Sequence, residues 1–451
     1  SERAGGYCGD GGGDYMTVTG CNITADGMYA GGVSPNTGHG CSYSAVTGCN
    51  IWAGSYAGGL TGRSTAGVVN VIIRDCAIFA EEYAGGLYGM KDAETGNHYA
   101  YNVIVTNCKI GRTTTEYPEA EEDPDNPDGY VVQWKTDSGR GTKFAGGLVG
   151  ESHGTRYYNS IVDDSVEVKA AQYGGGGFGR FGGGESHDLH IGTTVKVDGN
   201  YAGGLAGELI GYDQSLRGPN LLLYPVTKVQ RMILSGSVEG NAGVGGLAGY
   251  FTPGERPVDP EDGTEISDEV SGYRDMLHKD YFERIILAQT SVTSSTGSMG
   301  ILAQNDKAVQ TSGDGGVAYL RVYENLMYGT RSGAQPIRNQ PGVLGAFPTW
   351  TYEDSNTPES QYREAYLVTT DNLKNLDFYY GTKAKGGLYI KENTTSYWNA
   401  KDKVLANTNY FRNFYYSADV TDKGLFPYVT NSGSYVLVGA WLEEASPVQD
   451  G

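Results

Sequence analysis

A glycine-rich phrase recurs along the first two thirds of the chain at a nearly constant interval. The stretch "YAGGLTG" at 56–62 returns as "YAGGLYG" at 83–89, "FAGGLVG" at 144–150 and "YAGGLAG" at 201–207. The paired glycines lie at Gly5–Gly6, Gly31–Gly32, Gly58–Gly59, Gly85–Gly86, Gly146–Gly147, Gly175–Gly176, Gly203–Gly204 and Gly245–Gly246, and a degenerate copy, "SMGILA", follows at 298–303. Five of the steps between pairs span 26 to 29 residues. A fixed period of this kind indicates a repeat architecture rather than a single binding motif.

Short β-strands are predicted between the glycine phrases. The runs "VNVIIRDCAI" (69–78) and "YNVIVTNCKI" (101–110) are rich in β-branched residues, which favour strands. These two runs, and weaker copies at 15–23 and 43–51, are each interrupted by a pair of residues suited to a sharp, left-handed corner. These pairs are Thr19-Gly20, Thr47-Gly48, Arg74-Asp75 and Thr106-Asn107. With "YAGGL" as the next strand, each repeat contains three short strands and three corners.

The fold class that follows is all-β, a right-handed parallel β-helix of about nine coils of ~27 residues, stacked ~4.8 Å apart. Residues 1–304 form the repeat array, with inserted loops at 111–143 and 251–280. The coils that contain Gly85 and Gly146 should therefore be spatial neighbours. From residue 305 to 451 the phrase stops, and we expect a β-rich, aromatic C-terminal cap or docking segment, because a solenoid end exposes unpaired strand edges.

Whether two side chains of the glycine phrase face the interior or solvent is predicted from how much each position varies between copies. The Leu, as in Leu60, Leu87 and Leu148, should stack inside the coils, and the more variable residue after it should face solvent. The aromatic at the start of the phrase should form a column along one corner, at Tyr29, Tyr56, Tyr83, Phe144, Tyr173 and Tyr201. A carbohydrate could stack on the tyrosines of this column, but a purely structural aromatic ladder is the favoured interpretation.

Four of the six cysteines occupy one position of successive coils. They are Cys21, Cys49, Cys76 and Cys108, and later coils place Val166, Val195, Val238 and Val292 near the same slot. A slot shared by Cys and Val is a core slot, so we expect mostly buried, reduced thiols. Cys8 and Cys41 lie off this register and are the one pair left open for a disulfide. The absence of any CxxC spacing in the sequence argues against zinc.

Charge and hydropathy restrict the partners of the chain. Its net charge is -20, which argues against nucleic acid and anionic membrane surfaces. No apolar run reaches the ~20 residues needed to span a bilayer, so membrane insertion is not expected. The sequence starts inside a repeat, at "AGGYCG", without a signal peptide. We therefore expect it to be a processed or excised piece of a longer protein.

The repeated phrase also resembles a known family. "GGLVG", "GGLAG" and "GGLTG" are similar to the glycine-leucine repeat of bacterial surface proteins, often called the GLUG motif, and the segment 375–399 with "GLFPYV" at 424–429 resembles the end of such arrays. The phrase departs from the pattern at 173–179, "YGGGGFG", and at "SMGILA". The resemblance implies a secreted or cell-surface β-solenoid used in adhesion or fibre building, without catalytic residues. It implies as partners other units of a fibre, or host or microbial glycans.

An enzyme is the alternative, because β-helices also include polysaccharide hydrolases and lyases. "TGHGCS" around His39 and "VDDS" around Asp163 and Asp164 resemble motifs of polygalacturonases. Glycoside hydrolysis needs two carboxylates across one sugar bond. The order of these motifs is reversed here, and several coils separate them, so we expect no catalytic site.

Two further polar sequence patterns are interpreted as surface turns in preference to functional sites. "ESH" occurs at 151–153 and again at 185–187, followed by His190, which would suggest a triad or metal site if the copies stacked. Asp123, Asp125 and Asp128, followed by Gly129, loosely resemble a calcium loop but lack the full EF-hand spacing. We expect no obligatory cofactor, with calcium at these three aspartates as the one metal left open.

Overall fold

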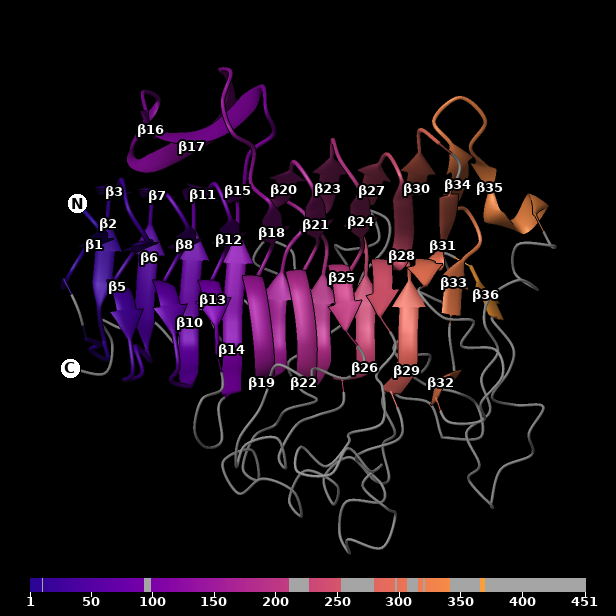
Figure 1. The fold of residues 1–451 in the computed structure, drawn as a ribbon, viewed down its shortest axis with the longest axis horizontal. Helices are drawn as coiled ribbons and strands as arrows, with labels where there is room; N and C mark the ends of the chain where they lie inside the picture. The colour runs from indigo at the N-terminus through magenta and orange to yellow at the C-terminus, as the bar shows by residue number, and fades with distance from the viewer. Residues whose placement is uncertain are drawn as a thin grey trace, which may run out of the picture.

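The computed structural model describes residues 1–340 except 10, 93–98, 211–226, 253–279, 297, 306–314 and 319–320, and also residues 366–369. Within these residues the chain is a parallel β-helix, whose coils follow one another along the long axis in Figure 1. Four strand segments make up a full coil. Equivalent segments of successive coils pair in parallel, so that four ladders run along the rod.

The first two ladders meet at the corner that follows the β-branched runs. The first ladder contains β2 (Thr17–Thr19), β6 (Ser44–Thr47), β10 (Val68–Arg74), β14 (Tyr99–Thr106), the second halves of β19 (Val149–Val162) and β22 (Phe178–Ile191), β26 (Thr227–Leu234), β29 (Asp280–Leu287), β32 (Gly315–Ala318), β33 (Arg321–Tyr323) and β36 (Tyr366–Val368). The second ladder contains β3 (Asn22–Ala25), β7 (Asn50–Ala53), β11 (Ala77–Ala80), β15 (Lys109–Ile110), β20 (Glu167–Ala170), β23 (Thr194–Val197), β27 (Ser237–Gly240), β30 (Ser291–Ser294) and β34 (Met327–Thr330).

The glycine phrase forms the other two ladders. The third contains β1 (Arg3–Gly5), β4 (Tyr29–Gly31), β8 (Tyr56–Gly58), β12 (Tyr83–Gly85), β18 (Phe144–Gly146), β21 (Tyr173–Gly175), β24 (Tyr201–Gly203) and the first halves of β28 (Gly243–Thr252) and β31 (Ser298–Asn305). The fourth contains β5 (Ser34–Thr37), β9 (Thr61–Ser64), β13 (Tyr88–Lys91), the first halves of β19 and β22, β25 (Ala206–Ile210) and the second halves of β28 and β31. A short antiparallel strand, β35 (Gln335–Pro336), and a 3-10 turn, η2 (Ile337–Asn339), follow β34.

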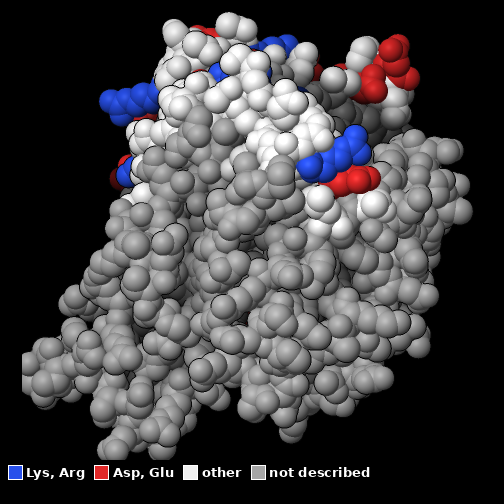
Figure 2. Space-filling model, turned by 90° about the vertical axis from the view of Figure 1, so that its right-hand side faces the viewer, with Lys and Arg blue, Asp and Glu red and all other residues white. Residues whose placement is uncertain are grey.

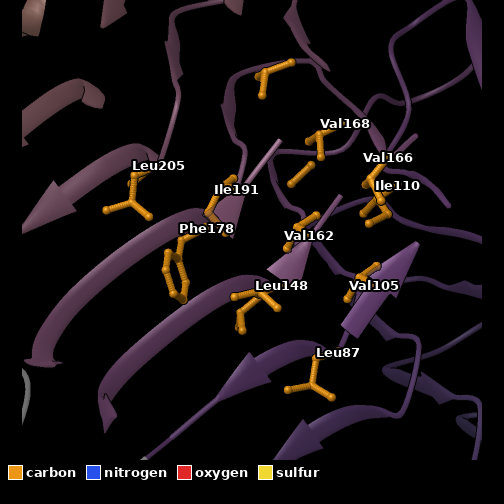
Figure 3. Close-up of a cluster of buried hydrophobic side chains, with 14 of the residues drawn as sticks. Leu87, Val105, Ile110, Leu148, Val162, Val166, Val168, Phe178, Ile191 and Leu205 are labelled. Carbon is orange, nitrogen blue, oxygen red and sulfur yellow. The ribbon is translucent and has the colours of Figure 1, made fainter. Parts of the chain in front are cut away.

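The predicted register of the glycine phrases is confirmed. Gly85 pairs with Gly146 although 61 residues separate them in sequence, so the coils on either side of the insertion are neighbours. Leu87 N–H donates to the carbonyl of Leu148, and Leu60 N–H donates to that of Leu87. All three leucine side chains are fully buried, and Figure 3 shows Leu87, Leu148 and Leu205 in one row of the interior. The degenerate copy also keeps this alignment, since Gly300 pairs with Gly245.

The number of strands in a coil was underestimated. The segment after the Leu is a fourth strand, and the residue that directly follows the Leu is buried rather than exposed. Thr61, Tyr88 and Val149 are all fully inaccessible to solvent. The chain reverses at Gly59–Leu60 and packs the fourth strand against the third, which turns these side chains inward. The segment was missed because stretches such as "TGRS" and "YGMK" contain at most one β-branched residue.

Close backbone packing explains the glycines of the phrase. A Cβ added to Gly86 would lie 2.1 Å from the carbonyl oxygen of Gly147 in the next coil. A Cβ on Gly62 would lie within 2.9 Å of the backbone oxygens of Ala30 and Tyr56, across the chain reversal. Real Cβ atoms do not approach this closely. The phrase is therefore retained at each coil because only glycine allows neighbouring backbones to come together there.

The corners between the first and second ladders have the left-handed backbone that their residue types predict. The φ angles are 66° at Gly20, 65° at Gly48, 56° at Asp75 and 46° at Asn107. A second column with positive φ, within the first ladder, was not anticipated. There the Asn102 side chain donates to Asn70 Oδ1, and the Asn159 side chain donates to Asn102. The stacked asparagine side chains hydrogen-bond to one another, and asparagine adopts a positive φ more readily than most other non-glycine residues.

The cysteine column is present in the first four coils. Cys49, Cys76 and Cys108 are fully buried, and all six cysteines are free thiols, including Cys8 and Cys41. The assignment of later residues to this slot was right only for Val166, which follows Cys108 in the ladder. The other three valines align with Ile110 and Val168 instead, and Thr193, Gly236 and Thr290 take the cysteine slot. The corner in those coils is two residues shorter than that assignment assumed, since the slot follows Ile191 by two residues at Thr193 and not by four at Val195.

We expect a thiol titration under denaturing, non-reducing conditions to count six free thiols per chain. Native protein should react more slowly, because the hydrogen bond with Cys76, together with burial, raises the pKa of Cys49, and burial, together with the hydrogen bond with Cys108, raises the pKa of Cys76. Cys21 and Cys8 are partly exposed and should react first with iodoacetamide. Fewer than four free thiols in the denatured chain would contradict the reduced column.

The insertion at 111–143 leaves the solenoid as predicted, but it contains a β-hairpin rather than only a loop. Strands β16 (Glu116–Asp123) and β17 (Asn126–Thr136) pair antiparallel and lie over the second ladder (Figure 1). The Asn50 side chain donates to the Ala120 carbonyl at 2.8 Å and accepts from its N–H at 2.7 Å. Trp134 Nε1 donates to Glu167 at 2.7 Å. The hairpin thereby ties separate coils of the second ladder together.

The parallel pairing continues past residue 304. β33 pairs with β29 and β34 pairs with β30, so at least part of the segment 305–451 extends the coils. The second insertion, at 251–280, and the remainder of the predicted C-terminal cap lie almost entirely outside the described residues.

Candidate functional surface

The predicted aromatic column is present on the outer side of the third ladder. Ring centroids of successive members lie 5.2, 5.0, 5.3, 4.6 and 5.4 Å apart from Tyr29 to Tyr201. Tyr250 extends the column at 4.8 Å from Tyr201, and the Arg3 guanidinium covers Tyr29 at 5.6 Å. Most of these pairs are nearly parallel. The register of the third ladder places one ring on each coil, and the ~4.8 Å rise between coils is close to a stacking distance.

The ring faces within this column are occupied by neighbouring rings. A sugar ring binds an aromatic side chain through its face, so stacking on Tyr56, Tyr83 or Tyr173 would require the column to open. These three tyrosines and Tyr201 are half-buried residues, whereas Tyr29 is buried. The arrangement matches the structural ladder that was the favoured interpretation, and glycan binding at the tyrosines stays a prediction without a contact to support it.

A row of charged side chains from the fourth ladder runs beside the aromatic column. Arg180 donates to Glu151 at 3.0 Å, and its Nε lies 3.1 Å from Glu208 Oε2 as an ion pair, so one guanidinium contacts the carboxylates of the coils on either side. His153 Nε2 lies 3.1 Å from the same carboxylate oxygen, Glu151 Oε1. Arg63 is bound to Asp92 at 2.7 Å. The charge alternates from Glu151 through Arg180 to Glu208 because these residues are in register on successive coils, which favours their stacking.

Glu151 in this row, and Tyr56 and Tyr83 beside it, have shifted pKa values. Burial disfavours the ionised form of Glu151, but the hydrogen bond and charge of His153 and the charge of Arg180 outweigh it, and the pKa of Glu151 is lowered. Burial, together with the carboxylates of Glu82 and Glu151, raises the pKa of Tyr56 to about 12. The same causes raise the pKa of Tyr83 further. Tyr56 and Tyr83 are therefore neutral over the physiological range, and the charged side chains beside them are paired with one another between coils.

The residues proposed for the enzyme alternative do not come together. Asp163 lies at the corner that follows Thr106, as expected, and its carboxylate accepts from the hydroxyls of Thr106 and Ser165. Three steps along the first ladder separate the Thr47 corner, which closely follows His39, from Asp163, a distance of ~14 Å. Asp163 is 3% exposed, and burial raises its pKa. Its hydrogen bonds stabilise the corner between the first and second ladders.

The two "ESH" copies are not in register with each other. Glu151 pairs with Arg180, whereas Glu185 pairs with Arg156, so no stacked triad forms. His187 lies 3.9 Å from the Tyr158 ring, and Glu185 accepts from the Tyr158 hydroxyl at 3.2 Å. His190 is fully buried, which lowers its pKa to about 3, and its Nε2 lies 3.0 Å from Ser235 Oγ. These histidines pack within ladders instead of gathering at one site.

The candidate calcium residues lie at the tip of the β16–β17 hairpin. Asp123 Oδ1 accepts from the backbone N–H of Asp125 at 2.9 Å, a local turn that uses one of its oxygens. The side chain of Asp128 lies outside the described part of the hairpin. Across the side chains that the structure describes, no three His, Cys, Asp or Glu residues are placed to hold a metal ion.

Lys91 is an unusual residue that sequence reasoning missed. Its side chain is fully buried in the fourth ladder, where its Nζ donates to the Asp92 carbonyl at 3.2 Å and lies 6.0 Å from the Tyr88 ring centre. Burial lowers its pKa to about 7. The register aligns it with Ser152, then Phe181, Leu209 and Phe251 in later coils. Aligning the copies by their glycine phrases would have revealed a lysine in a core slot.

Positive and negative side chains are mixed at the end of the rod that contains β34 and β35. Figure 2 shows basic and acidic side chains in small groups among uncharged residues, with no patch of one sign on the described part of this face. Ion pairs there include Arg331–Glu239 at 2.8 Å and Arg338–Glu324 at 3.8 Å. Within the described ranges, no helix has the length and apolar character needed to cross a bilayer. No protein-family model, curated protein or solved structure matches this chain.

Proposed function

We propose that the chain is a non-enzymatic structural or adhesive rod, displayed outside the cell as part of a larger bacterial surface protein or fibre. The observation that carries this proposal is the continuous parallel pairing along the rod, in which ring stacks, thiols, asparagines and ion pairs all join one coil to the next. The conspicuous side chains of the described surface are used for packing between coils. Such a molecule resists separation of its coils and presents a long, regular surface.

Association between copies is supported by the open N-terminal rung. In the described residues β2 pairs only with β6 and β3 pairs only with β7, which leaves one backbone edge of each without a strand. Three of the large apolar side chains that are most exposed, Tyr7, Tyr15 and Met28, are 62%, 51% and 44% accessible and lie on this first coil. An open edge with apolar side chains favours pairing with another chain. The net charge of -20 opposes lateral clumping, so end-to-end joining is favoured over bundles.

Electron microscopy of the purified protein over a series of salt and calcium concentrations tests this assignment. We expect end-to-end particles, with more sideways association as salt screens the charge. The double variant Tyr15→Lys, Met28→Lys should remain monomeric, because it replaces exposed apolar side chains beside the open edge with charges that oppose pairing. Val131→Lys, at a position 43% exposed on the hairpin, is the matched control and should assemble normally. Monomers under all conditions would leave a stand-alone adhesin as the better account.

A further inference from the structure

The thiol column at the corner between the first and second ladders has a regular spacing. Its four cysteines directly precede strands β3, β7, β11 and β15, which pair in register, and they are Cys21, Cys49, Cys76 and Cys108. The ladder of backbone hydrogen bonds continues through the column, since Asn50 N–H donates to the Cys21 carbonyl at 2.9 Å. Successive cysteines are therefore separated by one coil rise, ~4.8 Å.

The first two thiols of the column have matching hydrogen bonds. Cys21 Sγ donates to the Thr19 carbonyl at 3.5 Å, and Cys49 Sγ donates to the Thr47 carbonyl at 3.3 Å. Cys49 Sγ also accepts from the Cys21 backbone N–H at 3.4 Å. A hydrogen bond donated to sulfur stabilises the thiolate, which is the form of cysteine that binds metals. The backbone of the first coil thus already supports a thiolate on the second.

The surroundings of Cys21 and Cys49 provide no further metal ligand. Among the residues whose side chains are described, no third His, Cys, Asp or Glu is placed to complete a metal site with them. The hairpin lies over this corner instead. A Cβ added to Gly20 would lie 2.5 Å from the Tyr130 hydroxyl, and one added to Gly48 would lie 2.3 Å from the Tyr130 ring. Structural zinc needs four ligands and calcium needs six or more, so this pair of thiols suits neither ion.

We propose that Cys21 and Cys49 form a site for a soft monovalent metal ion, Cu(I) or Ag(I), held in a line between their two sulfur atoms. Thiolate ligands select soft ions of this class. Two metal–sulfur bonds of ~2.3 Å place the sulfur atoms ~4.6 Å apart, close to the ~4.8 Å rise between coils. A disulfide would instead require the sulfurs to approach to ~2.05 Å. The spacing of the column therefore fits a linear ion without displacement of the coils.

Binding at this site exchanges protons for the metal and changes no oxidation state. One monovalent ion and two thiols give a bis-thiolate complex with a single negative charge, and both thiol protons go to solvent. Cys21 is partly exposed and Cys49 is fully buried, so the ion enters at the open end of the column. The Cys21 N–H offsets part of the charge on the Cys49 sulfur. The bound ion joins the first coil to the second, whatever the function of the rod.

A metal titration of the full chain tests the site. With Cu(I) supplied anaerobically as its acetonitrile complex, we expect about one equivalent to bind per chain, with two sulfur neighbours in the X-ray absorption spectrum. Cys21→Thr should lower the affinity by more than about a hundredfold. Threonine occupies the same slot at Thr193 and Thr290, so the coil tolerates it. Cys8→Ser removes a partly exposed thiol outside the column and is the matched control, which should bind normally.

The titration has two outcomes that would overturn the proposal. One is a wild-type chain that binds no Cu(I), or that binds it with ligands other than two sulfurs. The other is binding that survives in Cys21→Thr and is lost in Cys8→Ser.

Protection of thiols provides a second readout that needs no variant. Among the cysteines, Cys8 and Cys21 are the two that are partly exposed, so iodoacetamide should alkylate both in the metal-free protein. With about one equivalent of Ag(I), which is not reduced or oxidised under these conditions, alkylation of Cys21 should slow by about tenfold or more, and that of Cys8 should not change. Equal protection of the two cysteines, or none at Cys21, would contradict a site in the column.

Discussion

Replacing Lys91 by methionine should stabilise the protein at neutral and mildly acidic pH by an amount on the order of 4 kcal/mol. The Lys91 side chain is fully buried, and its amine has the carbonyl of Asp92 as acceptor at 3.2 Å. Burial disfavours the charged amine and lowers the pKa from 10.5 to about 7. Methionine has a similar length and no charge, and the same slot holds Phe181 and Leu209 in later coils.

The effect of Lys91→Met should depend on pH in a defined window. Between pH 7 and 10.5 the unfolded chain binds a proton at Lys91 that the folded chain does not, so wild-type stability gains from this residue as pH rises. The penalty is complete below pH 7 and disappears above pH 10.5. The advantage of the variant should therefore shrink as pH rises through this window. Urea unfolding midpoints at pH 6, 8 and 10 measure it, with Lys196→Met on the outer side as control. A pH-independent difference would show that Lys91 is neutral or solvated throughout.

Replacing Gly86 by alanine should cost about 4 kcal/mol or more and separate the coils on either side of the insertion. The added Cβ would lie 2.1 Å from the Gly147 carbonyl oxygen and 2.9 Å from a methyl group of Val105. The first of these atoms belongs to a backbone held by ladder hydrogen bonds, so it cannot move away alone. The hydrogen bond of 2.7 Å from Leu87 N–H to Leu148 is the next to be lost.

Gly38→Ala is the matched control for this variant. Its added Cβ would have only the Thr65 hydroxyl within 4 Å, at 3.7 Å, so stability should change by less than about 0.5 kcal/mol. Hydrogen exchange at 83–89 and 144–150 locates the damage in Gly86→Ala, and limited proteolysis between the two coils provides an independent measure. Equal stability of the two variants would contradict the close-packing account of the glycine phrase.

The amino-acid sequence by itself determined the coil. The period, the inward leucines, the left-handed corners at Gly20 and Asn107, and the aromatic column were all predicted from it. Each of these features depends on short-range sterics that recur at every coil. A residue in one coil faces its own equivalent in the next, so a one-dimensional repeat is sufficient to specify the contact.

Tertiary structure alone decided the features that join non-equivalent residues. The burial of Thr61 and Lys91 follows from a chain reversal that packs the fourth strand on the third, and no local pattern announced that reversal. The hairpin of the insertion packs on Asn50, 70 residues before Ala120. Such contacts depend on the path of the backbone in three dimensions, because the partners share neither a repeat position nor a local sequence.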